Sequence, residues 1–368
     1  MNLFPNIRKA YTEDHATAHE AQRQAEMIVW GPVVFQTTRL MMKFGVLQLL
    51  RDHPDGLTAA ELAAHCKLSD YAIKVLLEAS LSIGTVLVHP DTDRYALTKT
   101  GWFLLMDPAH QVNMAFNHDV NYQGWFRLEE SLREGRPAGL EHFGSWPTVY
   151  EGLSQLPEQV QRSWFGFDHF YSDHSFDDAL KVVFASHPRR LLDVGGNTGR
   201  WAMQCVAYDP EVQVTVVDLP QQLALMREHT QGQPGSERIA GYGMNLLDGT
   251  AQFPTDVPYD VIWMSQFLDC FGEEEIVSIL SRAAHVMTDS TRLYIMETFW
   301  DRQKYEPAAF ALTMTSLYFT AIANGNSKMY HSDDMRRLVQ RAGMQVETLH
   351  DGLGFGHSIM VCRKDPTQ

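Results

Sequence analysis

Two short motifs hold residues whose types and spacing suit the binding of a nucleoside. The first, Asp193-Val-Gly-Gly-Asn-Thr-Gly199, stands between a predicted apolar strand and a predicted helix, and the second is Asp218 at the end of the next predicted strand. Glycines let the backbone approach a ligand closely, and an acidic side chain at the second strand end can accept both hydroxyls of a ribose. Together the two motifs predict a cofactor that contains a nucleoside.

The glycine spacing favours S-adenosylmethionine over a dinucleotide. Dinucleotide enzymes hold a pyrophosphate at a helix N-terminus, with glycines at three set positions. The segment Gly195-Gly-Asn-Thr-Gly199 is shorter than that pattern, and no second nucleotide-binding half follows it. S-adenosylmethionine carries adenosine, a sulfonium and an amino-acid tail but no phosphate, so a tight turn together with Asp218 suits it better.

The elements around these motifs predict an α/β, Rossmann-like domain over residues 189–368. Short apolar strands alternate with helical stretches, which is the order of a parallel sheet wound by right-handed crossovers. These strands cover residues 191–194, 212–217, 259–264 and 292–297. The last two predicted strands have only a glycine-rich loop between them, so they are expected to finish the sheet as an antiparallel hairpin. They cover residues 344–349 and 357–362.

The first third of the chain, residues 1–106, predicts a mostly helical winged-helix domain. Thr58 and Glu61 form a capping box that opens a short helix, and a second helix follows over 70–83. Two short strands around a turn then cover residues 85–98. Helix, turn, helix and hairpin is the order of a winged helix.

The charge of the chain argues against a nucleic-acid partner for this winged helix. The 368 residues carry a net charge of −15, and the candidate recognition helix sets Lys74 against Asp70 and Glu78. Phosphate binding needs a basic patch, which this helix lacks. The long apolar-periodic stretch over 21–50 instead favours a homodimer interface.

Composition also predicts a cytoplasmic protein. No run of about 18 uncharged apolar residues predicts a membrane span, and the first 24 residues lack the apolar stretch of a signal peptide. The cysteines are scattered and without CxxC spacing, so they are interpreted as reduced thiols and not as a zinc site or a disulfide frame. They are Cys66, Cys205, Cys270 and Cys362.

Residues 107–188 form a helical middle that is rich in aromatic residues and histidine, and we interpret it as a linker and substrate lid. Most of these side chains are expected in the core. A minority, among them Tyr122 and Tyr171, are predicted to line a pocket for a flat ring.

With these motifs in place, the chain resembles the class I methyltransferases of the caffeate-type and bacterial antibiotic O-methyltransferase family. The resemblance covers nearly the whole length and implies a small phenolic substrate, S-adenosylmethionine as cofactor and no metal. Leu192-Asp-Val-Gly-Gly-Asn-Thr-Gly199 resembles the cofactor turn, Val217-Asp-Leu-Pro220 the ribose-binding strand end, and Gly243-Met-Asn-Leu-Leu247 the stretch beside the adenine. It implies these cofactor-binding residues: Asp193, Gly195, Gly196, Asp218, Leu219, Asn245, Leu246, Ser265 and Gln266.

The chain departs from this family at the catalytic base. The family has a His before an Asp-Trp pair after the fourth strand, but here Leu268 precedes Asp269. Glu297 falls on one of the family's two supporting carboxylates, and Met329 replaces the other. A phenol has a pKa near 10, so transfer to its oxygen usually needs a base at this position.

A base elsewhere in the pocket is therefore expected. The candidates are His174, which lies where relatives have a helix facing the cofactor, His118, Asp269 and Glu297. Leu268, Met314 and Tyr318 are predicted to contact the substrate.

Three functions follow from this departure. The favoured one is methylation of a ring carbon ortho to the hydroxyl of tyrosine or a 4-hydroxyphenyl acid. The second is phenolic O-methylation with a relocated base. The third is a non-enzymatic cofactor binder or winged-helix regulator, against which the cofactor motif and the acidic first domain argue.

Overall fold

The computed structural model describes residues 3–366, and its contacts divide the chain into two compact units. One unit is residues 14–119, and the other joins residues 1–13 to residues 120–368. This division differs from the three predicted segments, because the N-terminal helix and most of the helical middle fall in the same unit as the sheet. No helix among the described residues has the length and apolar character needed to cross a membrane.

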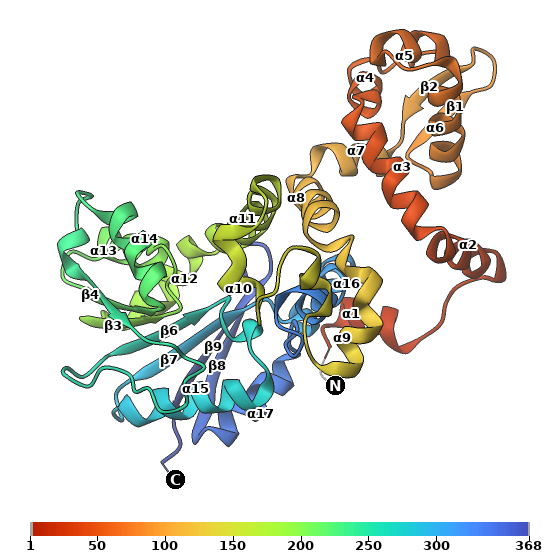
Figure 1. Ribbon diagram of the computed structural model, residues 1–368. Helices are drawn as coiled ribbons and strands as arrows, with labels where there is room; N and C mark the ends of the chain where they lie inside the picture. Colours follow the sequence, from red (N-terminus) through yellow and green to blue (C-terminus); the bar gives the residue numbers. More distant parts are fainter. Residues whose placement is uncertain (1–2, 367–368) are drawn as a thin grey trace. The chain divides into compact units, whose positions relative to one another are not determined.

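The unit of residues 14–119 has the predicted order of helix, helix and hairpin (Figure 1). The capping box is confirmed: the Thr58 N–H donates to the Glu61 carboxylate at 2.7 Å, and the Glu61 N–H donates to Thr58 Oγ1 at 3.3 Å. The elements are α2 Ala18–Val29, α3 Gly31–Lys43, α4 Val46–Asp52, α5 Ala59–Cys66, α6 Asp70–Ile83, β1 Val86–His89, β2 Arg94–Leu97, α7 Lys99–Met106 and α8 Pro108–Phe116.

The apolar-periodic stretch over 21–50 forms the three helices α2, α3 and α4. Pro32 lies in the first turn of α3, where a missing N–H is tolerated at a helix start but not inside a helix. Gly45 precedes α4 with φ of +79°, a left-handed conformation that ends α3. Four large apolar side chains on α2, α3 and the residue between them are more than half exposed in the single chain: Ile28, Val29, Trp30 and Val33.

The second unit is built on the predicted sheet, whose seven strands have the order β5-β4-β3-β6-β7-β9-β8. The five strands β3 to β7 pair in parallel, and β9 pairs antiparallel with both β7 and β8. The predicted antiparallel hairpin at the end of the sheet is confirmed. The strands are β3 Arg190–Val194, β4 Gln213–Asp218, β5 Ile239–Gly243, β6 Val261–Ser265, β7 Arg292–Glu297, β8 Met344–Leu353 and β9 His357–Lys364.

Helices cover both faces of this sheet (Figure 1). The helices α12 Phe176–Val183, α13 Arg200–Tyr208 and α14 Pro220–Thr230 pack on one face in a core that includes stacked Trp201 and Trp263 rings. The helices α15 Glu273–Val286 and α17 Ser332–Arg341 pack on the other face. Two covered faces explain why the parallel strands are nearly continuous apolar runs.

The remaining helices of this unit lie around the carboxyl end of the sheet and in the N-terminal segment. They are α1 Pro5–Thr12, α9 Leu128–Glu134, α10 Val149–Gly152, α11 Glu158–Asp173 and α16 Glu306–Tyr318. The described residues also form short 3-10 or π turns: η1 Asn117–Asn121, η2 Gly124–Arg127, η3 Ala138–His142, η4 Leu153–Gln155, η5 Phe184–Ser186, η6 Ser236–Arg238, η7 Leu268–Cys270, η8 Trp300–Arg302 and η9 Phe319–Ala323.

Candidate active site

The glycine turn after β3 is packed so tightly that side chains are excluded from it. Gly195 has φ of +75°, and its N–H donates to the Val217 carbonyl at 2.8 Å. A Cβ on Gly195 would lie 2.3 Å from the Phe267 ring, and one on Gly196 would lie 2.5 Å from the Asp193 carboxylate. Only glycine fits at these two positions, so the backbone of the turn itself forms the surface that a ligand meets.

Asp218, at the end of β4, holds this turn in place. Its carboxylate accepts the Asn197 N–H at 2.8 Å and the Leu219 N–H at 2.7 Å. Each carboxylate oxygen has a second lone pair, so two acceptor sites remain for the hydroxyls of a ribose. The half-buried position of Asp218 at the carboxyl end of a parallel strand therefore fits the ribose of S-adenosylmethionine.

Asp193 lies beneath the turn rather than at its surface. Its side chain is 2% exposed, and one of its oxygens has no hydrogen-bond partner among the described residues. Burial and the nearby charge of Asp218 raise the pKa of Asp193 to about 8. The structure places this predicted cofactor-binding residue as a support for Gly196.

The loop after β5 carries the residues predicted to lie beside the adenine. Asn245 is exposed, and its side-chain oxygen accepts the Leu247 N–H at 3.0 Å, which leaves the amide N–H₂ group free to meet a ligand. Leu246 is buried, and its carbonyl accepts a hydrogen bond from Arg282. The Arg282 guanidinium also donates to the Asp248 and Ala251 carbonyls, so one buried arginine fixes the whole loop. No motif in the sequence pointed to Arg282.

The end of β6 carries Ser265 and Gln266, both half-buried. Gln266 has φ of +44°, an uncommon conformation for a residue with a side chain. Its N–H donates to the Met296 carbonyl at 2.9 Å, which continues the pairing with β7. The strained residue turns the chain so that the Phe267 ring lies over Gly195, and such strain is typical of functional sites.

Glu297 at the end of β7 is a buried carboxylate that organises the turn η7. Its Oε1 accepts the N–H groups of Phe267 at 3.1 Å and Leu268 at 2.9 Å, whereas Oε2 has no partner among the described residues. Burial, followed by the charge of Asp269, raises the pKa of Glu297 well above its usual range.

Leu268 is fully buried in the core between the sheet, α15 and α17. The sequence predicted a substrate contact at this position. In the structure the Leu268 side chain packs in the apolar core and has no exposed surface, which supports a role in packing.

Asp269 contributes a second buried carboxyl to this part of the structure, within the turn η7. It is 7% exposed in the turn after β6, and its Oδ1 accepts a weak hydrogen bond from the Cys270 thiol at 3.5 Å. Burial and then the charge of Asp168 raise the pKa of Asp269 to about 7. A base of this pKa is half ionised at neutral pH, which is where general-base catalysis works best.

Three helices bring further polar groups to this turn. From α11, the Trp164 ring N–H donates to the Tyr318 hydroxyl of α16 at 2.7 Å. From α10, the Tyr150 hydroxyl hydrogen-bonds the Cys270 thiol, and desolvation raises the pKa of Tyr150 well above its usual value. Sequence reasoning predicted Tyr318 here but missed Tyr150, Trp164 and Asp168, which no short motif connects with Asp269.

Three other predicted residues lie on α11 or α16 or directly after α11. Met314 is exposed on α16, and Tyr171 contacts the rings of Phe167 and Phe170 on α11. His174 is exposed, and its Nδ1 hydrogen-bonds the Phe170 carbonyl at 2.8 Å.

His118 and Tyr122 come from either side of the boundary between the two units. His118 lies in the unit of residues 14–119, with Nδ1 2.6 Å from the Asp119 carboxylate. Tyr122 is half-buried at the start of the other unit, 6.5 Å between ring centroids from Trp125. A role in the site for either residue stays a prediction.

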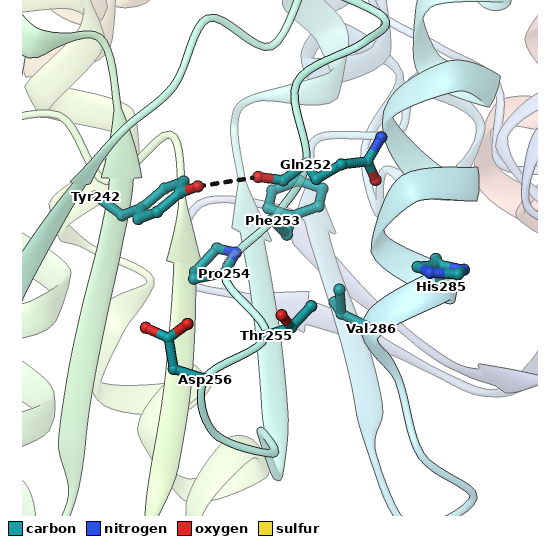
Figure 2. A pocket seen from close by; sticks show the side chains of 8 residues that line it. All are labelled: Tyr242, Gln252, Phe253, Pro254, Thr255, Asp256, His285 and Val286. Atoms are coloured by element: carbon teal, nitrogen blue, oxygen red, sulfur yellow. Dashed lines mark hydrogen bonds between the residues drawn. The ribbon is translucent and has the colours of Figure 1, made fainter.

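The cavity drawn in Figure 2 has a volume of about 380 Å³, and none of the residues predicted for the site lines it. It is bounded by Tyr242, the segment 252–256 that leads towards β6, and His285 and Val286 at the end of α15. Segment 252–256 and the end of α15 lead into the amino ends of β6 and β7, whereas Tyr242 lies near the carboxyl end of β5. Among residues 3–366 no group of His, Cys, Asp and Glu side chains has the arrangement of a metal site.

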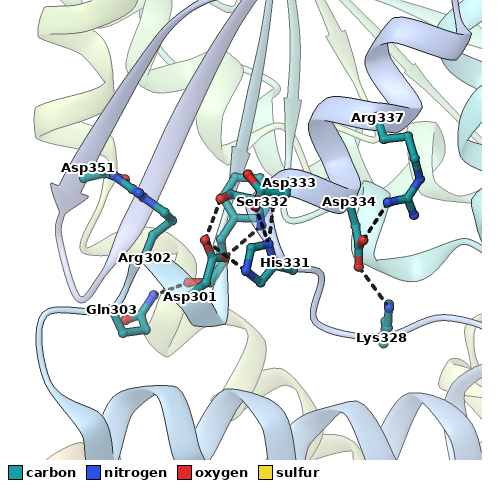
Figure 3. Close-up of polar contacts among 11 residues, drawn as sticks. Asp301, Arg302, Gln303, Lys328, His331, Ser332, Asp333, Asp334, Arg337 and Asp351 are labelled. Atoms are coloured by element: carbon teal, nitrogen blue, oxygen red, sulfur yellow. Dashed lines mark hydrogen bonds and ion pairs between the residues drawn. The ribbon is translucent and has the colours of Figure 1, made fainter. Parts of the chain in front are cut away.

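A second polar group fixes the loop that follows Glu297 (Figure 3). Asp301 is fully buried and accepts the N–H of Ser332 at 2.7 Å and its hydroxyl at 2.5 Å. His331 caps α17, because its Nδ1 accepts the Asp333 N–H at 3.0 Å. These bonds tie the loop after β7 to the start of α17, so the end of β7 is held from both sides.

The fold and the site together define an S-adenosylmethionine-dependent methyltransferase. Residues 125–345 match the family described as O-methyltransferase domain, and residues 22–95 match the family described as Dimerisation2-like domain. The chain therefore belongs to the O-methyltransferase domain family, and it is an enzyme of the methyltransferase class. The regulator without activity, kept open from the sequence, is thereby set aside.

Curated relatives differ in the atom that they methylate. The chain is 24% identical over 325 residues to the L-tyrosine C(3)-methyltransferase of Streptomyces lavendulae, covering 87% of this chain and 86% of that protein. It is also 24% identical over 273 residues to the 3-amino-4-hydroxybenzoate 4-O-methyltransferase of Streptomyces cremeus, covering 72% of this chain and 69% of that protein.

Solved structures support the same fold. The methyltransferase SibL in its apo form superposes with a TM-score of 0.71 at 21% identity, covering 92% of this chain and 98% of that chain. Human N-acetylserotonin methyltransferase in complex with S-adenosylmethionine superposes with a TM-score of 0.65 at 19% identity, covering 96% of this chain and 99% of that chain.

Proposed function

We propose that the enzyme methylates a phenolic small molecule at the ring carbon ortho to the hydroxyl, with tyrosine or a 4-hydroxyphenyl acid as substrate. The observation that carries the proposal is the replacement of the family's His by the core residue Leu268, next to the buried carboxyl of Asp269 with a pKa of about 7. The similarity to an L-tyrosine C(3)-methyltransferase supports the same reaction.

Asp269 is proposed as the base that removes the phenol proton. The ionised form of its carboxyl accepts the hydroxyl proton, which makes the ring carbon ortho to the oxygen electron-rich. When bound, S-adenosylmethionine supplies the methyl group of its sulfonium and leaves as the neutral sulfide. One carbon–carbon bond forms, one sulfur–carbon bond and one ring carbon–hydrogen bond break, and one proton is released to solvent overall.

The other residues of the turn are proposed to hold this carboxyl in place. Glu297 fixes the backbone of Leu268 through its N–H, and the Cys270 thiol lies between Asp269 and Tyr150. The pair of Trp164 and Tyr318 closes the turn from the side of α11 and α16.

O-methylation is the second candidate. The match to the O-methyltransferase domain family and the similarity to a 4-O-methyltransferase of an aminohydroxybenzoate favour it. In this reaction Asp269 removes the same proton, and the oxygen receives the methyl group.

One incubation distinguishes carbon methylation from oxygen methylation. The protein is incubated with S-adenosylmethionine carrying a ¹³C methyl group and with L-tyrosine, 4-hydroxyphenylacetate or 3-amino-4-hydroxybenzoate, and products are analysed by mass spectrometry and NMR. We expect a methyl signal in the aryl-methyl range and a ring proton lost from the ortho position. A methoxy signal from every accepted phenol would contradict carbon methylation.

We further infer a cytoplasmic homodimer that pairs through α2 and α3. The exposed Ile28, Val29, Trp30 and Val33 and the match to a dimerisation family support it. Sedimentation at micromolar concentration is expected to show twice the mass of one chain, and Trp30→Asp is expected to shift it towards the monomer. A wild-type protein that sediments as a monomer would contradict the inference.

A further inference from the structure

The turn between β8 and β9, residues 353–357, reaches the end of helix α11, and we call it the hairpin tip. Gly354 has φ of +50°, and a Cβ there would lie 2.5 Å from Ser175 Oγ and 2.6 Å from the His174 carbonyl oxygen. Its N–H also donates to the Asp178 carboxylate at 3.4 Å. Such a close approach requires glycine, so the hairpin tip is fitted to the junction of α11 and α12.

Aromatic rings extend this contact along α11. The Phe355 ring stacks on Phe170, with centroids 5.2 Å apart and planes 13° apart, and it lies 4.3 Å from the His174 ring. Phe355 is half exposed, so it covers the end of α11 from outside. His174, predicted from the sequence as a catalytic base, thus belongs to this aromatic contact.

A buried hydrogen bond completes the attachment. Ser175 Oγ and His357 Nδ1 lie 2.6 Å apart, and neither side chain is accessible to solvent. Burial lowers the pKa of His357 to about 4, so the ring stays neutral at physiological pH. On the other side of the tip, the Gln303 amide donates to the Gly356 carbonyl at 2.8 Å, which anchors the tip to the loop after β7.

Helix α11 carries two of the groups that meet the catalytic turn. Trp164 hydrogen-bonds Tyr318, and the charge of Asp168 acts on the carboxyl of Asp269. Positions 164 and 168 are four apart, on one side of the helix, and Asp168 lies two residues before Phe170. Trp164 is already held by Tyr318, so the hairpin tip matters most for the last turns of α11, which include Asp168.

We propose that Phe355 and His357 are positioning residues for methyl transfer: the hairpin tip clamps the end of α11 and thereby sets the acceptor side of the active site. The contacts of the hairpin tip named above are with α11, the start of α12 and the loop after β7, and none of them involves Gly195, Gly196 or Asp218. Loosening it therefore impairs use of the acceptor while binding of S-adenosylmethionine stays intact. The inference rests on the methyltransferase activity but not on whether a carbon or an oxygen atom of the phenol receives the methyl group.

The decisive variant is Phe355→Ala, because half of this side chain is exposed and its loss leaves the core filled. Phe355→Tyr is the conservative variant that keeps the ring, and Phe126→Ala is the matched control, since Phe126 is 82% exposed elsewhere in the same unit. The kinetic measurements use L-tyrosine, 4-hydroxyphenylacetate or 3-amino-4-hydroxybenzoate, whichever the wild type converts fastest. The rate includes both the carbon-methylated and the oxygen-methylated product.

We expect Phe355→Ala to lower kcat/KM for the acceptor about tenfold, as misplacement of reacting groups does. The Kd for S-adenosylmethionine by calorimetry stays within twofold, Phe355→Tyr restores the rate, and Phe126→Ala changes neither. Equal losses in acceptor use and cofactor binding, or an unchanged kcat/KM, would overturn the proposal.

Hydrogen exchange of the cofactor-bound protein gives a second readout that needs no acceptor. We expect faster exchange in Phe355→Ala over residues 158–173, with the strands β3 and β4 unchanged. Unchanged exchange in α11 would overturn the clamp, whether or not any of the three phenols is converted. If none of the phenols is converted but exchange in α11 is faster, the proposed substrate class fails and the clamp stands.

Discussion

The two ends of the active site are built in different ways. At the cofactor end, the turn of Gly195 and Gly196 and the carboxylate of Asp218 are joined by backbone hydrogen bonds between adjacent strands. At the acceptor end, side chains from α10, α11, α16 and two strand ends converge on the turn of Asp269. Backbone geometry needs particular residues at fixed spacing, whereas converging side chains can come from any element.

Both ends bury carboxyl groups, with different consequences. Asp193 lies under a turn that backbone bonds already hold, so its neutral form supports packing. Asp269 lies beside another carboxyl and a thiol in a turn that Glu297 organises, and its proton is the one proposed to move during the reaction. The following changes test this contrast, from the largest expected effect to the smallest.

Asp269→Asn is expected to lower kcat by about 10²- to 10⁴-fold, because the amide keeps the shape but cannot accept the proton. In the wild type, kcat should rise with pH through about 7, since the ionised carboxyl is the active form. That rise should be absent in the variant. Steady-state rates between pH 5.5 and 9 measure both, with the exposed Asp289→Asn as control. A variant within threefold of the wild type would remove Asp269 as the base.

Asp218→Ala is expected to weaken binding of S-adenosylmethionine at least tenfold. Hydrogen bonds to a charged group contribute about 1.5–3 kcal/mol each, and two ribose hydroxyls would lose their acceptor. Calorimetry measures the change against Asp289→Ala as control. An unchanged affinity would show that the cofactor lies elsewhere.

Leu268→His is expected to lower stability by about 2–5 kcal/mol, because it places a polar ring in a fully buried apolar site. In a chain of this size each kcal/mol corresponds to about 2–4 °C of Tm. Activity should fall with Tm, and the position of the methyl group in the remaining product should not change. A variant that keeps its Tm and forms the O-methyl product would place residue 268 at the acceptor and not in the core.

Asp193→Asn is expected to change the pH dependence of stability more than activity. The folded pKa of about 8 lies above an unfolded value near 3.9, so the folded state holds the extra proton between them. The contribution of this proton to the free energy of unfolding is fully present below about pH 4 and is lost as the pH rises to about 8. The loss is at most about 1.4 kcal/mol per pH unit. The Tm measured between pH 5 and pH 8 should therefore fall less steeply with rising pH in the variant than in the wild type. Parallel curves would contradict the raised pKa.

The amino-acid sequence by itself determined the order of the strands and helices, the closing hairpin and the cofactor turn. Each depends on neighbours in the chain: apolar runs between breaks, a capping box at Thr58, and glycines directly after a strand. The apolar period over 21–50 predicted helical structure but not its division at Pro32 and Gly45, because the period continues through both positions.

Tertiary structure alone decided the acceptor end. Leu268 and Asp269 are adjacent in the sequence and both are buried, yet the fold packs Leu268 into the apolar core and sets Asp269 where the charge of Asp168 acts on it. The pKa of Asp269 depends on desolvation and on Asp168 about 100 positions earlier. Likewise, only the folded chain brings Phe355 onto the end of α11, because a contact between distant segments leaves no fixed spacing in the sequence.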